Sequence, residues 1–409
     1  MKFARFALNN PVIGIVAGCL ILLLSTGTRA GFGLFLQPIS SDLGWGREVF
    51  AFALALQNLL WGASQPFGGA IADKYGSGRS IAVGGVLYSI GVALMAGVET
   101  PLGLSFSAGL LIGIGLSGTS FAVVLGAMVR EVPVEKRSMI LGIGTAAGSL
   151  GQFIMVPLGQ QFITSYGWPQ ALLLLSICVL IIVPAATALT GRSTDSPEEG
   201  QVNLDLRKAL NEALSHRGYL FLTAGFFVCG FHVAFIAAHL PAYIVDNGLA
   251  ADYGAWALAL VGLFNVIGSF TSGVMGGRHS KKRCLSFLYF ARAVVIVIFI
   301  LVPITPASVL VFSAAMGLLW LSTVPLTSGL VAQIFGPQYL STLFGIVFFG
   351  HQIGSFLGVW LGGYLFDATG SYNLVWWISV ALGVSSALLH LPINEQSLRM
   401  ATVSIATDN

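Results

Sequence analysis

Apolar runs of about 20 residues recur along the whole chain, and each is long enough to cross the hydrocarbon core of a bilayer as an α-helix. Only one long polar segment, Gly191–Arg217, interrupts the series, and it contains a helix-like stretch, Asp205–Leu214. The runs predict twelve membrane-spanning helices, near residues 11–38, 49–72, 80–98, 103–129, 138–164, 169–190, 219–246, 253–276, 284–303, 306–332, 341–366 and 372–392. The polar segment divides these helices six plus six.

The predicted fold is therefore an all-α membrane protein with twelve transmembrane helices in two six-helix halves. We expect an N-terminal half at residues 1–190, a cytoplasmic linker at 191–218, a C-terminal half at 219–392 and a cytoplasmic tail at 393–409. Composition agrees with this interpretation, because 56% of the 409 residues are hydrophobic and only 9% are charged. Soluble domains carry about 25% charged residues.

Several classes of protein are disfavoured by the same sequence. A net charge of +3 without a basic, aromatic-interleaved patch does not indicate a nucleic-acid partner. No phosphate-binding loop of the type GxxxxGK[ST] is present, so we do not expect ATP as the energy source. The spacing of the four cysteines matches neither a metal site nor a disulfide framework: Cys19, Cys178, Cys229 and Cys284. The sequence also shows no combination of a nucleophile with a general base. We expect no enzyme activity, no metal and no cofactor.

Basic residues predict the orientation in the membrane. If the N-terminus is cytoplasmic, all of the 19 Lys and Arg residues except Arg29, Arg47 and Arg292 fall on the cytoplasmic side. That asymmetry follows the positive-inside rule. We therefore expect a multi-pass protein of the plasma membrane, with the bacterial inner membrane as the expected location and both termini in the cytoplasm.

An internal repeat relates the two halves. The segment Gly69–Arg79, after the second span, matches Gly273–Arg283, after the eighth, and Gly151–Phe153 in the fifth span matches Gly354–Phe356 in the eleventh. In a parallel repeat of two six-helix halves, substrate sits between the halves near the bilayer midplane. We therefore expect the functional site at the interface of the halves.

The first copy of the repeated loop carries a specific motif. Gly69, Asp73, Lys74, Gly76 and Arg79 fit the pattern G-x3-D-[RK]-x-G-x-[RK] between the second and third spans. At these residues the chain resembles the major facilitator superfamily, and the resemblance extends nearly end to end. It implies that the loop is a conformational latch that stabilises one state of alternating access. The alternative is an exposed ion pair, which contributes about 0–1 kcal/mol. In the second copy, the acid of the motif is replaced by Gly277.

Within that superfamily, the chain is most similar to the monocarboxylate transporter and oxalate/formate antiporter group. The resemblance rests on Gly27–Phe35, with its Arg29, and on the following Leu43–Gly46. It implies a cationic residue in the first span, and it places His351 about where the oxalate/formate members carry a lysine. The eighth-span Asp-x3-Arg pair of the group falls on Asn265 and Ser269, so the roles of that pair are not transferred.

The ionisable residues within the predicted spans are cationic or potentially so. Every Asp and Glu falls in a loop or at a span end, whereas Arg29, Arg292, His232, His239 and His351 lie inside. Such residues are costly in a membrane and are retained for a partner, a water-filled cavity or a ligand. A guanidinium group matches a carboxylate, so this pattern favours an anionic substrate and disfavours a cationic one.

Arg29 is the leading predicted substrate contact, against the alternative that it snorkels to the outer surface or bonds backbone carbonyls. Phe32, His351, His232 and Gln352 complete the predicted substrate-binding set. For Arg292, in the ninth span, bonding to carbonyls or snorkelling to the cytoplasmic face is favoured over a ligand contact.

Histidine can change its protonation state between pH 5 and 8. His351, His232 and His239 are therefore the predicted proton-coupling candidates, and the alternative is that each is only a satisfied interhelical hydrogen-bonding group. His232 and His239, seven residues apart, share one face of the seventh helix.

These features together predict a secondary active transporter of a small organic anion, most simply a monocarboxylate. It is expected to work by alternating access, with a proton or a counter-anion moved in the same cycle. The alternatives are efflux of a larger amphiphilic or siderophore-like molecule and a non-transporting receptor or scaffold. The expected partners are the anion, the lipid bilayer and possible co-transported protons, and the chain is expected to act as a monomer without nucleic acid.

Overall fold

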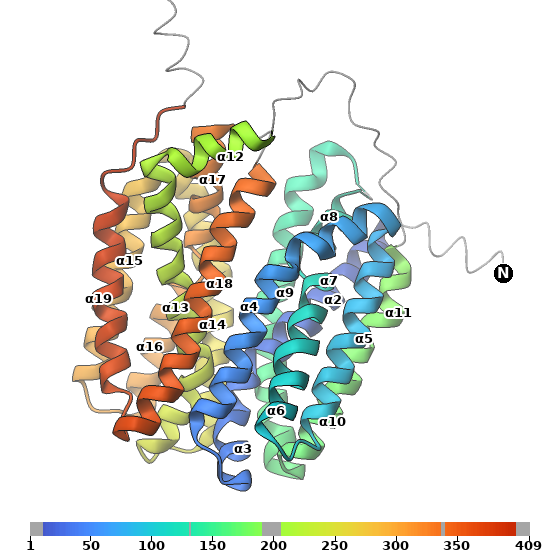
Figure 1. Ribbon diagram of the computed structural model, residues 1–409, viewed down its shortest axis with the longest axis vertical. Coiled ribbons are helices and arrows are strands. Elements are labelled where there is room, and N and C mark those ends of the chain that lie inside the picture. Colours follow the sequence, from blue (N-terminus) through green and yellow to red (C-terminus); the bar gives the residue numbers. More distant parts are fainter. Residues whose placement is uncertain (1–10, 131, 190–205, 337–339, 398–409) are drawn as a thin grey trace, which may run out of the picture.

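The computed structural model describes residues 11–130, 132–189, 206–336 and 340–397, and these form helices joined by short turns (Figure 1). The N-terminal half comprises α2 (Pro11–Ala30), η1 (Phe32–Phe35), α3 (Leu36–Leu43), α4 (Arg47–Tyr75), α5 (Ser77–Met95), α6 (Pro101–Leu104), η2 (Ser105–Leu111), α7 (Ile112–Gly118), α8 (Phe121–Arg130), α9 (Val134–Tyr166), α10 (Trp168–Leu180), α11 (Ile182–Ala186) and η3 (Thr187–Leu189). The C-terminal half comprises α12 (Leu206–Ser215), α13 (Arg217–Asp246), α14 (Ala251–Arg278), α15 (Lys281–Leu301), α16 (Pro306–Leu319), α17 (Thr323–Phe335), α18 (Leu340–Thr369) and α19 (Asn373–His390).

Eleven helical stretches within the described residues are long and apolar enough to cross a membrane. The twelfth span is α4, whose 29 residues cover about 43 Å at 1.5 Å per residue. Polar residues in its middle, Gln57, Asn58 and Gln65, make it less apolar than the other spans. The predicted all-α fold with twelve spans in two halves is confirmed. Most of the predicted linker and the last part of the predicted tail lie outside the described residues.

Four of the predicted spans are not continuous α-helices, and the sixth span is interrupted at Ile181, between α10 and α11. The first passes from α2 through the 3₁₀ turn η1 into α3, the fourth breaks between α7 and α8, and the tenth breaks between α16 and α17. The fourth span also contains a stretch of π-helix, η2. Breaks within membrane spans are tolerated where neighbouring helices or a cavity satisfy the freed backbone groups. The fourth and tenth spans hold corresponding places in the two halves, so the break is itself part of the internal repeat.

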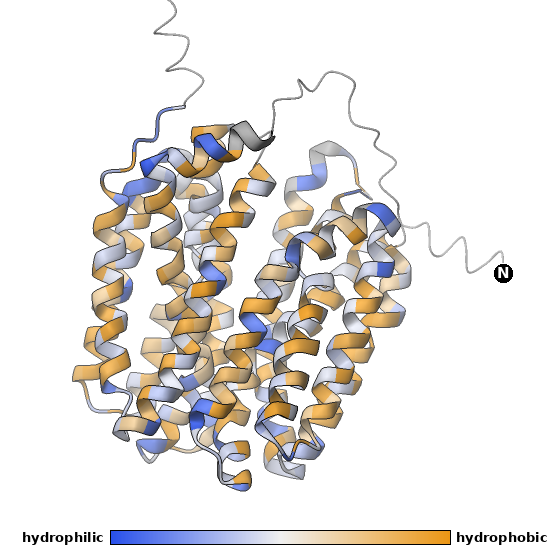
Figure 2. Cartoon of the chain, in the orientation of Figure 1, coloured by the Kyte–Doolittle hydropathy of each residue, from blue (hydrophilic) through white to orange (hydrophobic). Residues whose placement is uncertain are grey.

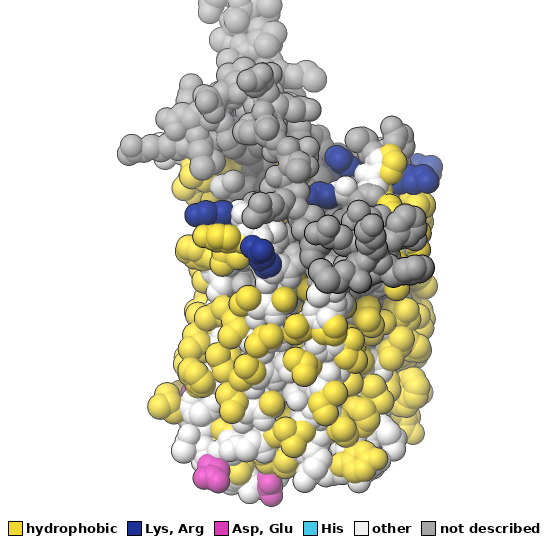
Figure 3. All heavy atoms as spheres, turned by 90° about the vertical axis from the view of Figure 1, so that its right-hand side faces the viewer, with side chains coloured by type: hydrophobic (Ala, Val, Ile, Leu, Met, Phe, Trp, Pro, Cys, Tyr) yellow, Lys and Arg dark blue, Asp and Glu magenta, His cyan; other side chains and the backbone are white. Residues whose placement is uncertain are grey.

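Charge is divided between the two ends of the molecule. Figure 2 shows that hydrophobic residues predominate along the middle of the helices. On the face that Figure 3 shows, apolar side chains form a broad band, with basic side chains at one end and acidic side chains at the other. We call the first the basic end, with Lys74, Arg79, Arg130, Arg217, Arg278, Lys281, Lys282 and Arg283, and the second the acidic end, with Asp42, Glu48, Glu99, Asp246, Asp252 and Asp367. The amphipathic α12 lies across the basic end of the C-terminal half, where it buries Ala213 (Figure 1).

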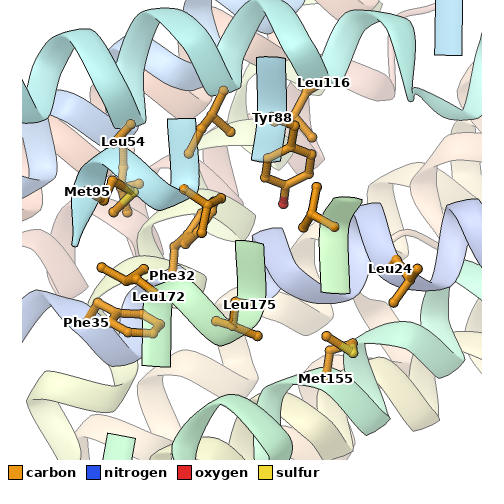
Figure 4. Close-up of a cluster of buried hydrophobic side chains, with 14 of the residues drawn as sticks. Leu24, Phe32, Phe35, Leu54, Tyr88, Met95, Leu116, Met155, Leu172 and Leu175 are labelled. Carbon is orange, nitrogen blue, oxygen red and sulfur yellow. The ribbon is translucent and has the colours of Figure 1, made fainter. Parts of the chain in front are cut away.

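Buried hydrophobic residues form three clusters, of which one lies mainly in the N-terminal half and two lie within the C-terminal half. The N-terminal core includes Leu24, Phe35, Tyr88 and Met155 (Figure 4). Two further clusters fill the C-terminal half, one toward the basic end and one around Trp376. The N-terminal core continues across the interface to Ala234, Ala238 and Val359, so apolar packing also joins the two halves.

Candidate functional site

A small cavity of about 60 Å³ lies between the two halves. One side is formed by α2, η1, α4 and α9, and the other by α13, α18 and the break between α16 and α17. The residues that line it are Arg29, Ala30, Phe32, Gly33, Leu54, Gln57, Asn58, Gln152, Val233, Ala234, Ala237, Ala238, Trp320 and Val359. This location is the one expected for a substrate site in a two-half transporter.

Arg29 provides the charge of the cavity. Its Nη2 donates to Asn58 Oδ1 at 2.5 Å, and its guanidinium carbon lies 4.6 Å from the centre of the Trp61 ring. Asn58 is itself fixed, because its Nδ2 donates to the Leu54 carbonyl oxygen at 2.8 Å. The Nε of Arg29 is fully buried and has no hydrogen-bond partner. Its Nη1 also has no hydrogen-bond partner among the described residues, but this atom is not fully buried. The cavity lining contains no carboxylate, so one face of the guanidinium remains available to an anion.

Phe32 lines the cavity but is mostly part of the N-terminal core. It is 2% exposed, and its ring meets that of Tyr88 edge to face, with centroids 6.4 Å apart. Figure 4 shows Phe32 within this apolar cluster. Gly33, one residue further on, brings η1 so close to α13 that a Cβ at this position would overlap the Ala237 carbonyl oxygen.

His351 and Gln352 lie on α18 outside the cavity lining. Gln352 is fully buried against Gly62 of α4, where an added Cβ would be 2.7 Å from Gln352 Cγ. The His351 ring stacks on Phe348 at 5.7 Å, and Phe348 meets Trp61 at 5.6 Å. An aromatic path therefore joins the Arg29 guanidinium to His351 across the two halves.

His232 and His239 are held inside the C-terminal half. Nε2 of His232 lies 2.8 Å from the Ser379 carbonyl oxygen, while its Nδ1 is buried without a partner. Nε2 of His239 lies 2.8 Å from the Val359 carbonyl oxygen and its Nδ1 lies 3.1 Å from the Tyr372 hydroxyl. Neither ring lines the cavity, and both tie the seventh span to neighbouring helices.

Arg292 is 1% exposed on α15 and bonds backbone carbonyls. Its Nε and Nη2 donate to the Leu319 oxygen at 3.1 and 2.6 Å, and Nη2 also donates to the Trp320 oxygen. The structure therefore agrees with the alternative in which Arg292 bonds backbone carbonyl groups.

The latch residues lie at the basic end, between α4 and α5. Gly76 has a φ of +98°, a conformation that favours glycine, and it makes the turn between these helices. Lys74 and Arg79 are exposed, and the side chain of Asp73 is not among those that the structure describes. Arg130 Nη1 donates to Ser77 Oγ at 3.0 Å, which joins this turn to the end of α8.

The second copy of the loop, Gly273–Arg283, is contacted by a carboxylate from the segment after α19. Glu395 Oε1 accepts from the backbone N–H of Lys282 at 2.8 Å, and Lys282 Nζ donates to the Ile393 carbonyl oxygen at 2.7 Å. The segment after α19 therefore places an acid against the loop in which Gly277 replaces the acid of the motif.

The acidic end carries a polar lock between the halves. Arg47, the first residue of α4, donates from both terminal nitrogens to Asp246 at 2.6 and 2.7 Å, and from Nη1 to the Tyr372 hydroxyl at 3.0 Å. Asp367 accepts from the backbone N–H groups of Arg47 and Glu48, as expected for a carboxylate at a helix N-terminus. Toward the basic end, the described residues record no cross-half hydrogen bond or ring contact beyond Trp61–Phe348 and Ser149–Asn265.

Sequence reasoning did not single out Asn58, Trp61, Trp320 or the lock around Arg47. The polar pair Gln57-Asn58 in the middle of an apolar run was a usable signal. No sequence pattern marks Trp320, because its place depends on a helix break. Within the described residues, no group of three His, Cys, Asp or Glu side chains could hold a metal ion.

Comparison with known proteins shows which family has this architecture. The family model of the Major Facilitator Superfamily matches residues 18–320 and 225–399. Monocarboxylate transporter 12-B of Danio rerio is 24% identical, covering 92% of this chain and 85% of the relative. Monocarboxylate transporter 11 of Homo sapiens is 25% identical, covering 90% and 79%. An uncharacterised MFS-type transporter of Bacillus subtilis (strain 168) is also 25% identical, covering 89% and 90%.

Among solved structures, a D-xylose-proton symporter has a similar fold, with a TM-score of 0.72 at 14% identity, over 95% of this chain and 99% of the other. The repeat, the twelve spans and the family match over most of the chain agree, and the protein is a member of the Major Facilitator Superfamily.

Proposed function

We propose that this protein is a secondary active transporter that moves a small organic anion, most simply a monocarboxylate, by alternating access. The observation that carries the proposal is the Arg29 guanidinium in the cavity between the halves, with no carboxylate in the lining to neutralise it. Charge-assisted hydrogen bonds from arginine to a carboxylate are strong and directional. Apolar side chains of Ala234, Ala237 and Val359 on the opposite wall suit a short hydrocarbon tail.

Two further observations support a small substrate. The cavity between the halves is small, at about 60 Å³. Relatives at 24–25% identity are named monocarboxylate transporters. The efflux alternative lacks a comparable observation.

The state of the molecule fits one step of the transport cycle. With the basic end in the cytoplasm, as the positive-inside rule requires, the lock around Arg47 closes the outer side of the cavity. The hydrogen bonds and ring contacts that join the halves among the described residues end near the middle of the molecule, which supports our assignment of an inward-facing state. We place the protein in the bacterial inner membrane as part of the same proposal.

For coupling, His351 is the best proton-binding candidate among the three histidines. It keeps 8% exposure, against 0% for His232 and 1% for His239, and the aromatic path through Phe348 and Trp61 leads from it to Arg29. Exchange of the substrate for a second anion at Arg29 is the other route to a coupled cycle.

Uptake of labelled acetate, lactate and butyrate into proteoliposomes tests the proposal, with Arg29→Ala and Arg29→Lys beside the wild type. Removing a buried charge that pairs with a carboxylate costs 2–5 kcal/mol, so Arg29→Ala should lower uptake about 30-fold or more. Arg29→Lys keeps the charge and should retain part of the activity. Arg283→Ala, which removes an exposed arginine at the basic end, is the matched control. Wild-type uptake of these anions in the Arg29→Ala protein would overturn the assignment.

A further inference from the structure

A chain of hydrogen bonds leads from the lock at the acidic end to a buried histidine. Arg47 Nη1 donates to the Tyr372 hydroxyl at 3.0 Å, and the same hydroxyl lies 3.1 Å from Nδ1 of His239. Nε2 of His239 lies 2.8 Å from the Val359 carbonyl oxygen. Arg47 belongs to the N-terminal half, whereas the other three residues belong to the C-terminal half. The chain therefore crosses the contact between the halves and ends on a group that can bind a proton.

With a neutral ring, one arrangement of hydrogens satisfies all of these bonds. The Val359 carbonyl can only accept, so we assign the hydrogen of His239 to Nε2, which leaves Nδ1 as an acceptor. Arginine can only donate, so the Tyr372 oxygen accepts from Arg47 and its O–H donates to Nδ1. Each bond then joins one donor to one acceptor, and the closed lock requires His239 to be neutral.

A proton on Nδ1 would reverse the last bond of the chain. Nδ1 would become a donor, and the Tyr372 oxygen would meet two donors while its own hydrogen lost its acceptor. The imidazolium and the Arg47 guanidinium would both have a nitrogen within 3.1 Å of that oxygen. His239 is 1% exposed, packs on Phe235, and leaves no space for a Cβ at Gly362. In such a buried place the repulsion between two positive charges is only weakly screened.

The titratable and charged groups around this ring come from α4, α13, α18 and the residue before α19: Arg47, Tyr243, Asp246, Asp367 and Tyr372. Both carboxylates are already used in the closed lock. Asp246 pairs with the terminal nitrogens of Arg47, and Asp367 accepts from the backbone N–H groups at the start of α4. Among the described residues, Tyr372 is the titratable side chain in hydrogen-bond or ring contact with His239.

We infer that His239 is a proton-binding site that controls the lock: the neutral ring holds the acidic end closed, and protonation opens it. When the halves separate at this end, Arg47 leaves with α4, and Asp246 and Asp367 stay in the C-terminal half without their partners. The loss of a positive neighbour and the release of two negative ones favour a charged imidazole. Opening and protonation therefore strengthen each other by the same factor.

The direction of this control rests on the proposed function, which places the acidic end outside the cell. Acid on that side then opens the outer path to Arg29, and the histidine is part of the gate, separate from the proposed coupling group His351. The proton site itself concerns the protein alone and is tested without any anion.

The test measures opening at the acidic end of the full-length protein in lipid nanodiscs. Spin labels at Leu102 and Asn247, which are exposed at this end on opposite halves, are introduced into a variant without the native cysteines. Electron-electron double resonance gives the ratio of long to short distances at two pH values. Because a histidine in water titrates near pH 6.5, this ratio should rise about tenfold between about pH 7.5 and pH 5.5. Exposed aspartates titrate near pH 3.9 and stay charged over that range.

His239→Gln keeps a neutral donor and acceptor but cannot bind a proton near neutral pH, so its ratio should be the same at both pH values. His279→Gln, at the exposed basic end, is the matched control and should keep the tenfold response. His351→Gln should keep it as well, because that ring is not part of the chain. Tyr372→Phe, which removes the hydroxyl between Arg47 and His239, should weaken the response and serves as the second variant if His239→Gln does not fold.

A wild-type distance distribution that is identical at both pH values would overturn the proton site. A full response in His239→Gln or in Tyr372→Phe would do the same, as would its loss in His351→Gln. Absence of anion uptake by the wild type would overturn the proposed function but leave these distances, and the proton site, unaffected.

Discussion

Two arginines lie within the membrane spans that the structure describes, and their surroundings give them different tasks. Arg29 keeps a terminal nitrogen available in the cavity, because Asn58 and the Trp61 ring occupy only part of its guanidinium. Arg292 bonds the carbonyl groups at the end of α16 and does not line the cavity. The same type of side chain is therefore a candidate ligand contact at Arg29, in the N-terminal half, and a structural hydrogen-bond donor at Arg292, in the C-terminal half.

The histidines give a prediction at the same scale. Replacing His351 by Gln preserves hydrogen bonding but removes the group that can bind a proton near neutral pH. If His351 couples transport to protons, anion uptake driven by an imposed pH gradient should fall to the level seen without a gradient, while exchange of anion for anion should persist. Gradient-driven and exchange uptake are measured side by side in proteoliposomes.

His279→Gln, at the exposed basic end, is the control for that experiment. The double variant His351→Gln, His232→Gln tests whether the second histidine substitutes for the first. Wild-type gradient dependence in the double variant would exclude both as the coupling groups.

At the scale of helices, interruptions matter as much as the spans themselves. The first span changes direction at η1, where Gly33 lies against the α13 backbone with no space for a side chain. The breaks in the fourth and tenth spans expose backbone groups that polar side chains then bind. Ser25 Oγ and Thr119 Oγ1 are 3.0 Å apart, and Gln65 Nε2 donates to Ser120 Oγ at 2.8 Å. These interruptions bring polar groups to the middle of apolar helices.

Gly33→Ala tests the contact between η1 and α13. The added methyl group would overlap the Ala237 carbonyl oxygen, so the two halves should close less tightly at this level. Overpacking of this kind costs about 1–3 kcal/mol, and we expect a lower melting temperature together with slower anion uptake. Gly126→Ala, on α8 with no atom near the new methyl group, should keep both values or raise the stability slightly. Equal behaviour of the two variants would show that the close approach at Gly33 is not required.

At the scale of the whole molecule, polar contacts between the halves gather at the acidic end. Arg47 joins the start of α4 to the end of α13 through Asp246, and Asp367 on α18 caps the same helix. Trp360 Nε1 adds a bond to Glu48 Oε1 at 3.1 Å. Because this polar cluster joins the two halves at the acidic end, it stabilises the state in which the acidic end is closed.

Asp246→Asn should therefore shift the equilibrium toward the state that is open at the acidic end. Losing a charge-assisted bidentate pair of about 1.4 kcal/mol corresponds to a tenfold change in population. Spin labels at Leu102 and Asn247, which are exposed at this end on opposite halves, report the change as a longer distance by electron-electron double resonance. The labels are placed in a variant without native cysteines. Asp252→Asn, which removes an exposed carboxylate at the same end, should leave the distance distribution unchanged, and an unchanged distribution in Asp246→Asn would contradict the lock.

The sequence by itself determined the number of spans, the division into halves and the family, because hydrophobic length, loop charge and a repeated loop motif are local properties. It also identified Arg29 as the charge to explain, since any arginine within an apolar run requires a partner. The predicted substrate-binding set was only partly brought together, with Arg29 and Phe32 in the cavity lining and His351, His232 and Gln352 outside it.

Only the tertiary structure decided which of these groups meet. The partners of Arg29 come from α4, the carbonyls bound by Arg292 come from a break in another span, and Trp320, which lines the cavity, lies in that break. Helix breaks and contacts between distant spans depend on how hydrogen bonds are satisfied in three dimensions, so no periodicity along the chain could reveal them.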